Sequence, residues 1–224
     1  MRAADKIRAF YPALLGAYGP QGWWPGETPL EVCVGAILTQ NTAWRNVERA
    51  IANLKAAGPL EPGALWQLPP ERLAELIRPA GYFRLKAGRL RNFLALLVND
   101  FDASLSRLFE LPTTELRERV LAVRGIGRET ADSIVLYAAA RPVFVIDAYT
   151  LRIAFRHGLA DETTDYETLQ ETLASALEPD VQLFKEYHAL LVRVGKEHCK
   201  KRAPECPGCS LQQFLEPGEP RAPA

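Results

Sequence analysis

Apolar residues recur at intervals of three and four along most of the chain, the spacing that places them on one face of an α-helix. No sustained alternation of apolar and polar residues bounded by hairpin turns occurs, so the pattern predicts no β-sheet. Arg141 to Ile146 is expected to be extended, because a proline stands second in this run. The predicted fold class is all-α, with helices near residues 4–17, 29–39, 42–56, 70–78, 84–99, 113–123, 128–140, 148–158, 164–177 and 181–197.

Length and composition set broad limits. A chain of 224 residues, 48% of them hydrophobic, can bury a sizeable core in one large or two small domains. No run of about eighteen apolar residues occurs, so a soluble, cytoplasmic protein with no membrane partner is expected. The 27 basic and 27 acidic residues cancel, so a surface for nucleic acid must be local. Two stretches concentrate basic side chains: Arg78, Arg84, Lys86, Arg89 and Arg91, and Arg193, Lys196, Lys200, Lys201 and Arg202.

The most informative short motif runs from Val123 to Ala131 and reads Val-Arg-Gly-Ile-Gly-Arg-Glu-Thr-Ala. Helical patterns flank it on both sides, so Gly125 and Gly127 are predicted to form a tight turn between two helices, a helix-hairpin-helix. The first amides of the helix that begins at Arg128 have no partner within that helix, and its dipole is positive at this end. Such a turn can bind a phosphate, although an ordinary helical hairpin would give the same pattern.

Two further features follow in the sequence. Asp147 stands a helix length after the hairpin, in Val-Ile-Asp-Ala-Tyr, and three cysteines near the C-terminus have the spacing Cys199-x6-Cys206-x2-Cys209. In this order the motifs resemble those of the endonuclease III-type DNA glycosylases, which belong to the helix-hairpin-helix, Gly/Pro-Asp superfamily. The resemblance covers roughly residues 1–215. It implies two helical domains around a DNA-binding cleft that receives the flipped base.

The resemblance also implies how the chain is divided. Residues 22–134 would form a helical domain that holds the hairpin, and residues 1–21 with 135–215 would form a second domain that holds an iron–sulfur-type loop. The segment 216–224 has three prolines and few apolar residues, so a disordered tail is expected there. A monomer that acts on double-stranded DNA containing damaged bases is expected.

Asp147 occupies the position of the superfamily's catalytic aspartate, which implies the same role here. A carboxylate close to the sugar would stabilise the positive charge that builds up as the N-glycosidic bond breaks, or would activate a water. An aspartate before Ala148 could also simply cap a helix, and both roles can coexist.

Glu129 departs from the pattern of one branch of the superfamily. Members that also nick the DNA backbone carry a lysine here, whose free amine attacks the sugar and forms a Schiff base. A carboxylate cannot react in this way, so the sequence predicts a monofunctional glycosylase that leaves an abasic site. Lys86 or another lysine could substitute from elsewhere, but nothing in the sequence supports this.

Three of the four tryptophans fall in two stretches, 22–25 and 38–44. Similar residues line the base pocket in the branch that removes alkylated purines, typified by bacterial 3-methyladenine DNA glycosylase III. A purine methylated on a ring nitrogen is cationic, and aromatic faces attract it. Core packing is the alternative for these side chains, and it is favoured for Trp66. The base pocket implied by the resemblance contains Trp23, Trp24, Pro25 and Trp44.

The resemblance also implies how DNA is held open. A glutamine at position 40 would fill the hole left by the flipped nucleotide, and an apolar residue at position 82 would wedge into the opposite strand. Without that context, Gln40 would be an ordinary polar residue at a helix end and Tyr82 a half-buried aromatic. The implied DNA-binding residues are Gln40, Tyr82, Gly125, Gly127, Arg128, Lys200 and Lys201.

The three clustered cysteines match three of the four positions of the superfamily's iron–sulfur loop. Leu215 occupies the fourth. The resemblance implies that Cys199, Cys206 and Cys209 are metal ligands of a [4Fe-4S] cluster with an unknown, non-cysteine fourth ligand. A labile or zinc-substituted centre and a loop that has lost its metal are the other outcomes. The remaining cysteine, Cys33, is interpreted as a small core residue.

Other functions are also compatible with parts of this pattern. A thymine or uracil mismatch glycosylase would share Asp147 and lack the lysine. An adenine-specific mismatch glycosylase would need an acid in the helix before Gln40, and residues 34–39 supply none. Glu129 disfavours a bifunctional enzyme for oxidised pyrimidines. A non-catalytic helix-hairpin-helix protein would bind DNA through the same turn, but the intact Asp147 is evidence against it.

Overall fold

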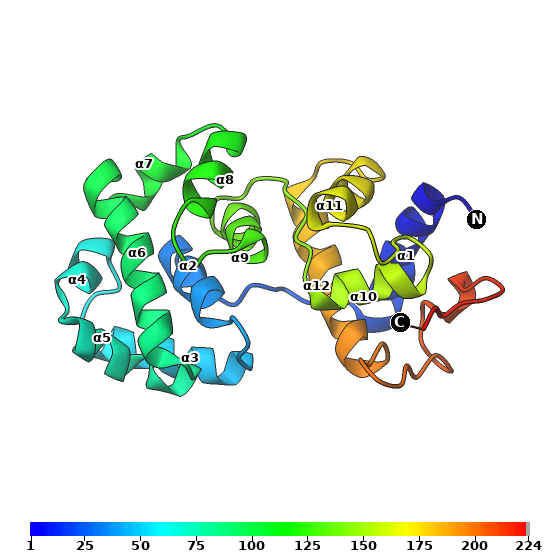
Figure 1. Cartoon of the computed structure of the whole chain (residues 1–224), viewed down its shortest axis with the longest axis horizontal. Helices are drawn as coiled ribbons and strands as arrows, with labels where there is room; N and C mark the ends of the chain where they lie inside the picture. Colours follow the sequence, from blue (N-terminus) through cyan, green and yellow to red (C-terminus); the bar gives the residue numbers. More distant parts are fainter. Residues whose placement is uncertain (223–224) are drawn as a thin grey trace. The chain divides into compact units, whose positions relative to one another are not determined.

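The computed structural model describes residues 1–222, which form helices joined by turns and loops with no strand among them (Figure 1). The predicted all-α fold class is thus confirmed. No described helix combines the length and the apolar character needed to cross a bilayer. The elements are α1 (Ala3–Tyr18), α2 (Pro29–Leu38), α3 (Trp44–Ala57), α4 (Pro62–Gln67), α5 (Pro70–Leu76), η1 (Arg78–Ala80), α6 (Phe83–Phe101), α7 (Leu105–Phe109), α8 (Thr113–Leu121), α9 (Arg128–Ser133), η2 (Ile134–Ala138), α10 (Ala148–Arg156), α11 (Tyr166–Ser175), α12 (Val181–Glu197) and η3 (Gln212–Phe214).

Each helix predicted from the apolar spacing is present. The spacing missed α4, α7 and η3, because elements of six residues or fewer are too short to show a helical period. The helix expected over 128–140 is divided: α9 ends at Ser133 and η2, a π-helical turn, follows it. The run Arg141 to Ile146 contains no helix.

The chain forms two compact units. Unit 1 contains Met1–Trp23 and Pro142–Ala224, and unit 2 contains Trp24–Arg141. Residues 135–141, expected in the domain formed by the two ends of the chain, therefore belong to the unit that holds the hairpin. The reason is packing, since η2 contacts α2 and its residues 134–137 are buried.

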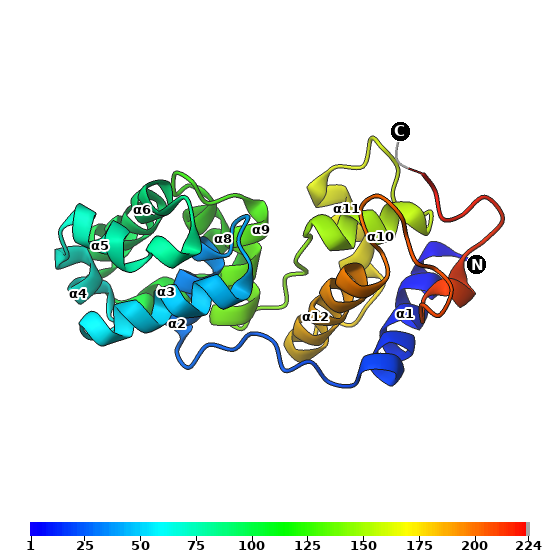
Figure 2. The same cartoon turned by 90° about the horizontal axis from the view of Figure 1, so that it is seen from below.

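Unit 2 is built around α2. All residues of this helix from Leu30 to Leu38 are buried, and it contacts α3, α6, α9 and η2 (Figure 2). Its start is fixed by Thr28, whose side chain accepts a hydrogen bond from the Glu31 amide at 3.2 Å. The loop 39–43, which leads from α2 into α3, is therefore attached directly to the core of the unit.

Unit 1 packs α12 against α1 and α10. Its core includes Phe10, Phe144 and Phe184, together with Tyr187, whose hydroxyl donates to the carbonyl of Ile7 at 2.7 Å. The last three α-helices of this unit each begin at an aspartate that caps the amide three residues further on. These aspartates are Asp147, Asp165 and Asp180.

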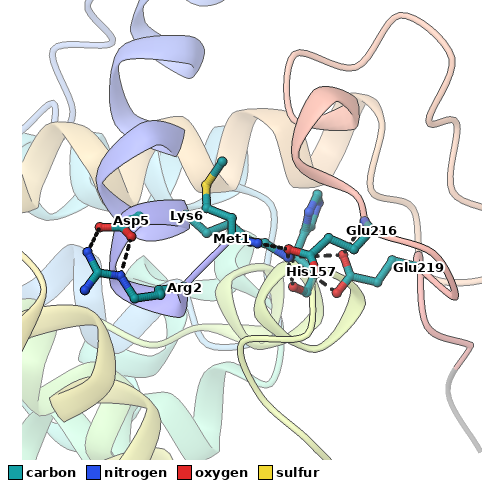
Figure 3. A network of polar contacts seen from close by, with 7 residues as sticks. All are labelled: Met1, Arg2, Asp5, Lys6, His157, Glu216 and Glu219. Atoms are coloured by element: carbon teal, nitrogen blue, oxygen red, sulfur yellow. Dashed lines mark hydrogen bonds and ion pairs between the residues drawn. The ribbon is translucent and has the colours of Figure 1, made fainter.

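The last described residues are held against α1 by Lys6 (Figure 3). Lys6 is 4% exposed, and its ammonium donates to the carbonyl of His157 at 2.8 Å and lies 3.3 Å from the carboxylate of Glu219 and 3.6 Å from that of Glu216. A buried cation needs such partners. Within the segment expected to be a disordered tail, Glu216 and Glu219 thus contact Lys6, while 223–224 lie outside the described residues.

Candidate DNA-binding and catalytic residues

The helix-hairpin-helix lies in unit 2 and consists of α8, a glycine turn and α9. Gly125 has a φ of +95°, a conformation that side chains rarely adopt, and a Cβ there would lie 2.5 Å from the Cγ of Arg89. Ile126 is buried and anchors the turn in the core. Arg117 of α8 donates to both carboxylate oxygens of the buried Asp132 of α9, at 2.5 and 3.0 Å. The turn thus has a defined shape.

There is open space at Gly127. A Cβ at Gly127, the residue before α9, would meet nothing within 4 Å, so packing within the chain does not require glycine there. Arg128 and Glu129 follow and are both exposed. The backbone can therefore approach a phosphate oxygen closely at this position.

Gln40, from the loop after α2, is hydrogen-bonded to the hairpin. Its Nε2 donates to Thr130 Oγ1 at 2.9 Å and to the carbonyl of Gly125 at 3.3 Å, and its Oε1 accepts from Arg89. Gln40, which is expected to fill the gap left by the flipped nucleotide, and the predicted phosphate-binding turn thus lie together in one unit.

Tyr82 precedes α6 in the left-handed conformation, with a φ of +43°. It is 74% exposed. The half-buried aromatic, considered as the alternative for this residue, is therefore wrong. Leu85, one turn into α6, is also exposed.

The first basic stretch is not a continuous surface patch. Lys86 is 1% exposed and donates to three oxygens, so it is not available as a nucleophile on DNA. Arg91 donates to the carbonyls of Trp66 and Leu68, and its guanidinium lies 4.5 Å from the centre of the half-buried Trp66 ring. Of this stretch, Arg78 and Arg84 remain exposed.

Two of the predicted pocket tryptophans pack against each other in unit 2. The rings of Trp24 and Trp44 are nearly perpendicular, at 86°, with centres 5.2 Å apart, and Tyr137 lies 5.3 Å from Trp24. A Cβ on Gly35 of α2 would lie 3.1 Å from both indole rings. The aromatic cluster thus depends on a glycine in the buried helix. Both tryptophans are half-buried.

The remaining pocket candidates are Pro25 and Trp23. Pro25 is exposed, and it lines a hollow together with Trp44 and Glu48. The Trp44 indole N–H donates to Glu48 at 2.8 Å. Trp23 is half-buried and belongs to unit 1.

Asp147 stands in unit 1 at the start of α10. Its Oδ1 accepts from the amide of Thr150 at 2.7 Å, so it does cap the helix, while its Oδ2 lies 3.8 Å from His188 Nε2. Burial lowers the pKa of His188, and the charge of Asp147 opposes that shift. The carboxylate is thus oriented through one oxygen.

The cysteine loop lies in unit 1, where Cys199, Cys206, Cys209 and Leu215 line one hollow. Arg156, which is buried, donates to Cys199 Sγ at 3.2 Å and to the carbonyls of Lys200 and Lys201 at 2.7 and 3.0 Å. Within residues 1–222, no three His, Cys, Asp or Glu side chains converge as a site for a metal ion. The donor chemistry suits iron–sulfur ligation at three positions, and Leu215 supplies no ligand at the fourth.

The side chains of Lys200 and Lys201 are exposed, and Lys200 pairs with Glu205 at 2.5 Å. The second basic stretch is exposed throughout. Cys33 is fully buried in α2, as expected for a core residue, and burial raises the pKa of its thiol.

Sequence reasoning missed several residues that support these groups. Tyr137 and Gly35 are ordinary residues on helices, and no local pattern marks them. Arg89 was recognised only as part of a basic stretch, and its bond to Gln40 was not expected. His188 and Arg156 become informative only when α12 and the cysteine loop are placed beside α10. A lysine at position 86 between Leu85 and Ala87 was a weak signal, because it falls on the apolar face of its helix.

These features together define a helix-hairpin-helix DNA glycosylase. Residues 34–179 match the HhH-GPD superfamily of base excision DNA repair proteins, and the chain belongs to this superfamily. It is therefore an enzyme of base excision repair, a DNA glycosylase.

Two sequence relatives extend over most of the chain. A protein of Methanocaldococcus jannaschii named as a DNA repair glycosylase is 44% identical over 211 residues, which are 94% of this chain and 96% of the relative. Endonuclease III of Thermotoga maritima is 29% identical over 192 residues, which are 84% and 83% of the two chains.

Solved structures show the same fold. The 3-methyladenine DNA glycosylase MagIII of H. pylori, solved bound to 1,N6-ethenoadenine, is 28% identical, with a TM-score of 0.74, over 88% of this chain and 98% of that one. An endonuclease III–DNA complex has a TM-score of 0.81 at 21% identity, with 97% of both chains covered.

Proposed function

We propose that this glycosylase is monofunctional and removes alkylated purines, such as 3-methyladenine, from double-stranded DNA. The observation that carries the proposal is the perpendicular packing of Trp24 and Trp44, with Tyr137 against Trp24 and Gly35 beneath both indoles. Electron-rich rings at defined angles attract a flat cationic base through stacking and cation–π contact. The 28% identity to a 3-methyladenine glycosylase supports this choice of substrate.

Release of an alkylated base requires little catalytic assistance from the protein. A purine methylated on a ring nitrogen is positively charged, so it leaves as a neutral base with the electron pair of the N-glycosidic bond. Asp147 stabilises the positive charge that develops on the sugar, and a water forms the new bond to the anomeric carbon and loses a proton. The aromatic residues hold the base, and no acid needs to protonate it.

Glu129 explains why the enzyme is expected not to cleave the DNA backbone. A carboxylate at the position of the lyase lysine forms no Schiff base, and the buried Lys86 cannot replace it because its ammonium is engaged by three oxygens. The product is therefore an intact strand with an abasic site.

DNA is held by residues of both units. In unit 2, the turn of Gly125, Gly127 and Arg128 binds a phosphate, Gln40 fills the gap left by the flipped nucleotide, and the exposed Tyr82 wedges between bases of the other strand. In unit 1, the exposed Lys200 and Lys201 contact phosphates. The enzyme acts as a monomer.

The cysteine loop holds a [4Fe-4S] cluster in this proposal, with Cys199, Cys206 and Cys209 as its protein ligands. The support is that all three thiols line one hollow beside the buried Arg156, which donates to Cys199 Sγ. The cluster would stiffen the loop that carries Lys200 and Lys201, and it takes no part in base release.

The test is base release from defined duplexes. We expect free 3-methyladenine from methylated DNA, with strand breaks only after alkali, and much slower release by Asp147→Asn. Release of uracil or thymine without alkylated purine would assign the enzyme to the mismatch glycosylases instead. Strand breaks without alkali on oxidised pyrimidines would contradict both the substrate and the role of Glu129.

A further inference from the structure

Lys86 is a lysine inside the core of unit 2, on α6. It is 1% exposed, and its ammonium donates to the carbonyl of Leu38 at 2.8 Å, to Thr42 Oγ1 at 2.6 Å and to the carbonyl of Ala80 at 2.8 Å. These three bonds use all the protons of the ammonium. Each acceptor is a neutral oxygen, so the burial of the charge is not offset by an opposite charge at these contacts.

The three acceptors belong to two different segments. The carbonyl of Leu38 lies just before the loop 39–43 and Thr42 lies within it, so two bonds fix the loop that carries Gln40. Ala80 closes η1 and stands two residues before Tyr82. A further bond joins the segments directly, since the Thr42 hydroxyl donates to the carbonyl of Ala80 at 2.6 Å.

Arg89 extends this arrangement by one helical turn. It lies three residues after Lys86, on the same side of α6, and donates to the side chain of Gln40. Thus α6 holds the backbone of the loop through one cation and the side chain of Gln40 through a second. The proximity of Arg89 also disfavours the charge on Lys86. A charge kept in the core against both burial and repulsion is costly, and this cost indicates a functional role.

We propose that Lys86 is a positioning residue that couples the loop 39–43, which carries Gln40, to the turn that carries Tyr82. Gln40 and Tyr82 then enter the two strands of DNA together. This rests on the roles proposed above for those two side chains. It does not depend on which lesion is excised. Without the ammonium, each segment could still fold, but only the bond from Thr42 to Ala80 would join them, so their separation would be fixed less closely and opening of the duplex would become slow.

The experiment measures duplex opening without chemistry. A duplex carries a tetrahydrofuran abasic analogue with 2-aminopurine opposite it, and the rise in 2-aminopurine fluorescence on binding reports insertion at the gap. Lys86→Met should reduce the rate of this rise at least fivefold, while binding to undamaged duplex and the helical circular dichroism stay near those of the wild type. Lys86→Arg should restore part of the rate. Arg72→Met, which removes an exposed cation from α5 of the same unit, is the matched control and should behave as wild type.

Thr42→Val is the second variant, because it removes one acceptor and the direct link to Ala80 without removing the charge. It should slow opening in the same direction, even if Lys86→Met does not fold. Normal opening by folded Lys86→Met or by Thr42→Val would overturn the proposal, as would an equal loss of opening and of binding to undamaged DNA. Failure of the wild type to release alkylated purines would overturn the proposed substrate instead, since the abasic analogue contains no base to excise.

Discussion

Asp147 and His188 face each other in unit 1, with Oδ2 of the carboxylate 3.8 Å from Nε2 of the imidazole. Both side chains are largely buried, at 11% and 7% exposed. Because burial lowers the pKa of His188 below its usual 6.5, the imidazole is neutral at pH 7. A neutral imidazole adds no positive charge beside Asp147, and stabilisation of a cationic sugar requires a negative charge there.

Asp147→Asn should remove activity without removing the fold. The asparagine oxygen can still cap the Thr150 amide, so the melting temperature should stay within a few degrees of the wild type. Loss of the negative charge should slow base release by about a hundredfold or more, measured in single-turnover assays. Asp180→Asn makes the same change at the start of α12 and should keep full activity. Equal activity of Asp147→Asn and wild type would show that another group performs the chemistry.

Glu129→Lys should introduce the missing amine. Position 129 is exposed in the first turn of α9, so a lysine fits there without disturbing the core. We expect borohydride to trap a covalent complex of this variant with abasic DNA, and the wild type to give none. Glu129→Gln removes the carboxylate without adding an amine and should also give no complex. Trapping of the wild type would mean that another lysine reaches the sugar.

Gly35→Val should damage the base pocket. A Cβ added at this position would lie 3.1 Å from Trp24 and from Trp44, so the larger valine must push both rings aside. We expect a change in tryptophan fluorescence and a loss of base release of at least tenfold, with undamaged DNA bound as before. Gly88→Ala is the control within the same unit, because a Cβ there meets nothing within 4 Å. It should increase the free energy of unfolding by about 1 kcal/mol through helix propensity alone.

Lys86 should give the protein an unusual dependence of stability on pH. Burial and the nearby Arg89 lower the pKa of Lys86 to about 8 in the folded state, against 10.5 for an ordinary lysine. Between these values the unfolded chain binds the proton and the folded chain does not, so this lysine makes stability rise as pH increases from about 8 to 10.5. Across the window the contribution is roughly 3 kcal/mol. Unfolding of wild type and Lys86→Met by urea at pH 7.5, 9 and about 10.5 should show the difference between them changing in this direction. A constant difference would place the pKa of Lys86 near 10.5.

The positions of the helices could be predicted from the sequence, because each helix buries one face and its apolar residues therefore recur at helical spacing. The same reasoning placed Gly125 in the hairpin turn, where a positive φ requires glycine. It could not identify the partners of a side chain across helices. Lys86 was grouped with surface arginines, although its position on the apolar face of α6 sends it into the core. Lys6 and Glu219, 213 residues apart, make contact through the tertiary fold, and no local pattern at the end of the chain predicts this contact.

Leu215→Cys tests the cysteine loop. Leu215 lines the same hollow as the three cysteines and occupies the position where the superfamily's loop has its fourth ligand. If the loop binds a cluster through three thiolates, a fourth thiolate at position 215 should hold the iron that the wild type loses most easily. The iron content of anaerobically purified protein should then rise towards about four iron atoms per chain, and the visible absorbance of the cluster should last longer in air. Leu215→Ala opens the same space without adding a thiol and should not retain more iron than the wild type.

Because Arg156 holds Cys199 in place, Arg156→Met should lower the iron content both of the wild type and of Leu215→Cys. Iron-free protein from the wild type and from Leu215→Cys alike would mean that the loop is ordered by Arg156 and its hydrogen bonds alone, and that Lys200 and Lys201 need no metal to be presented to DNA.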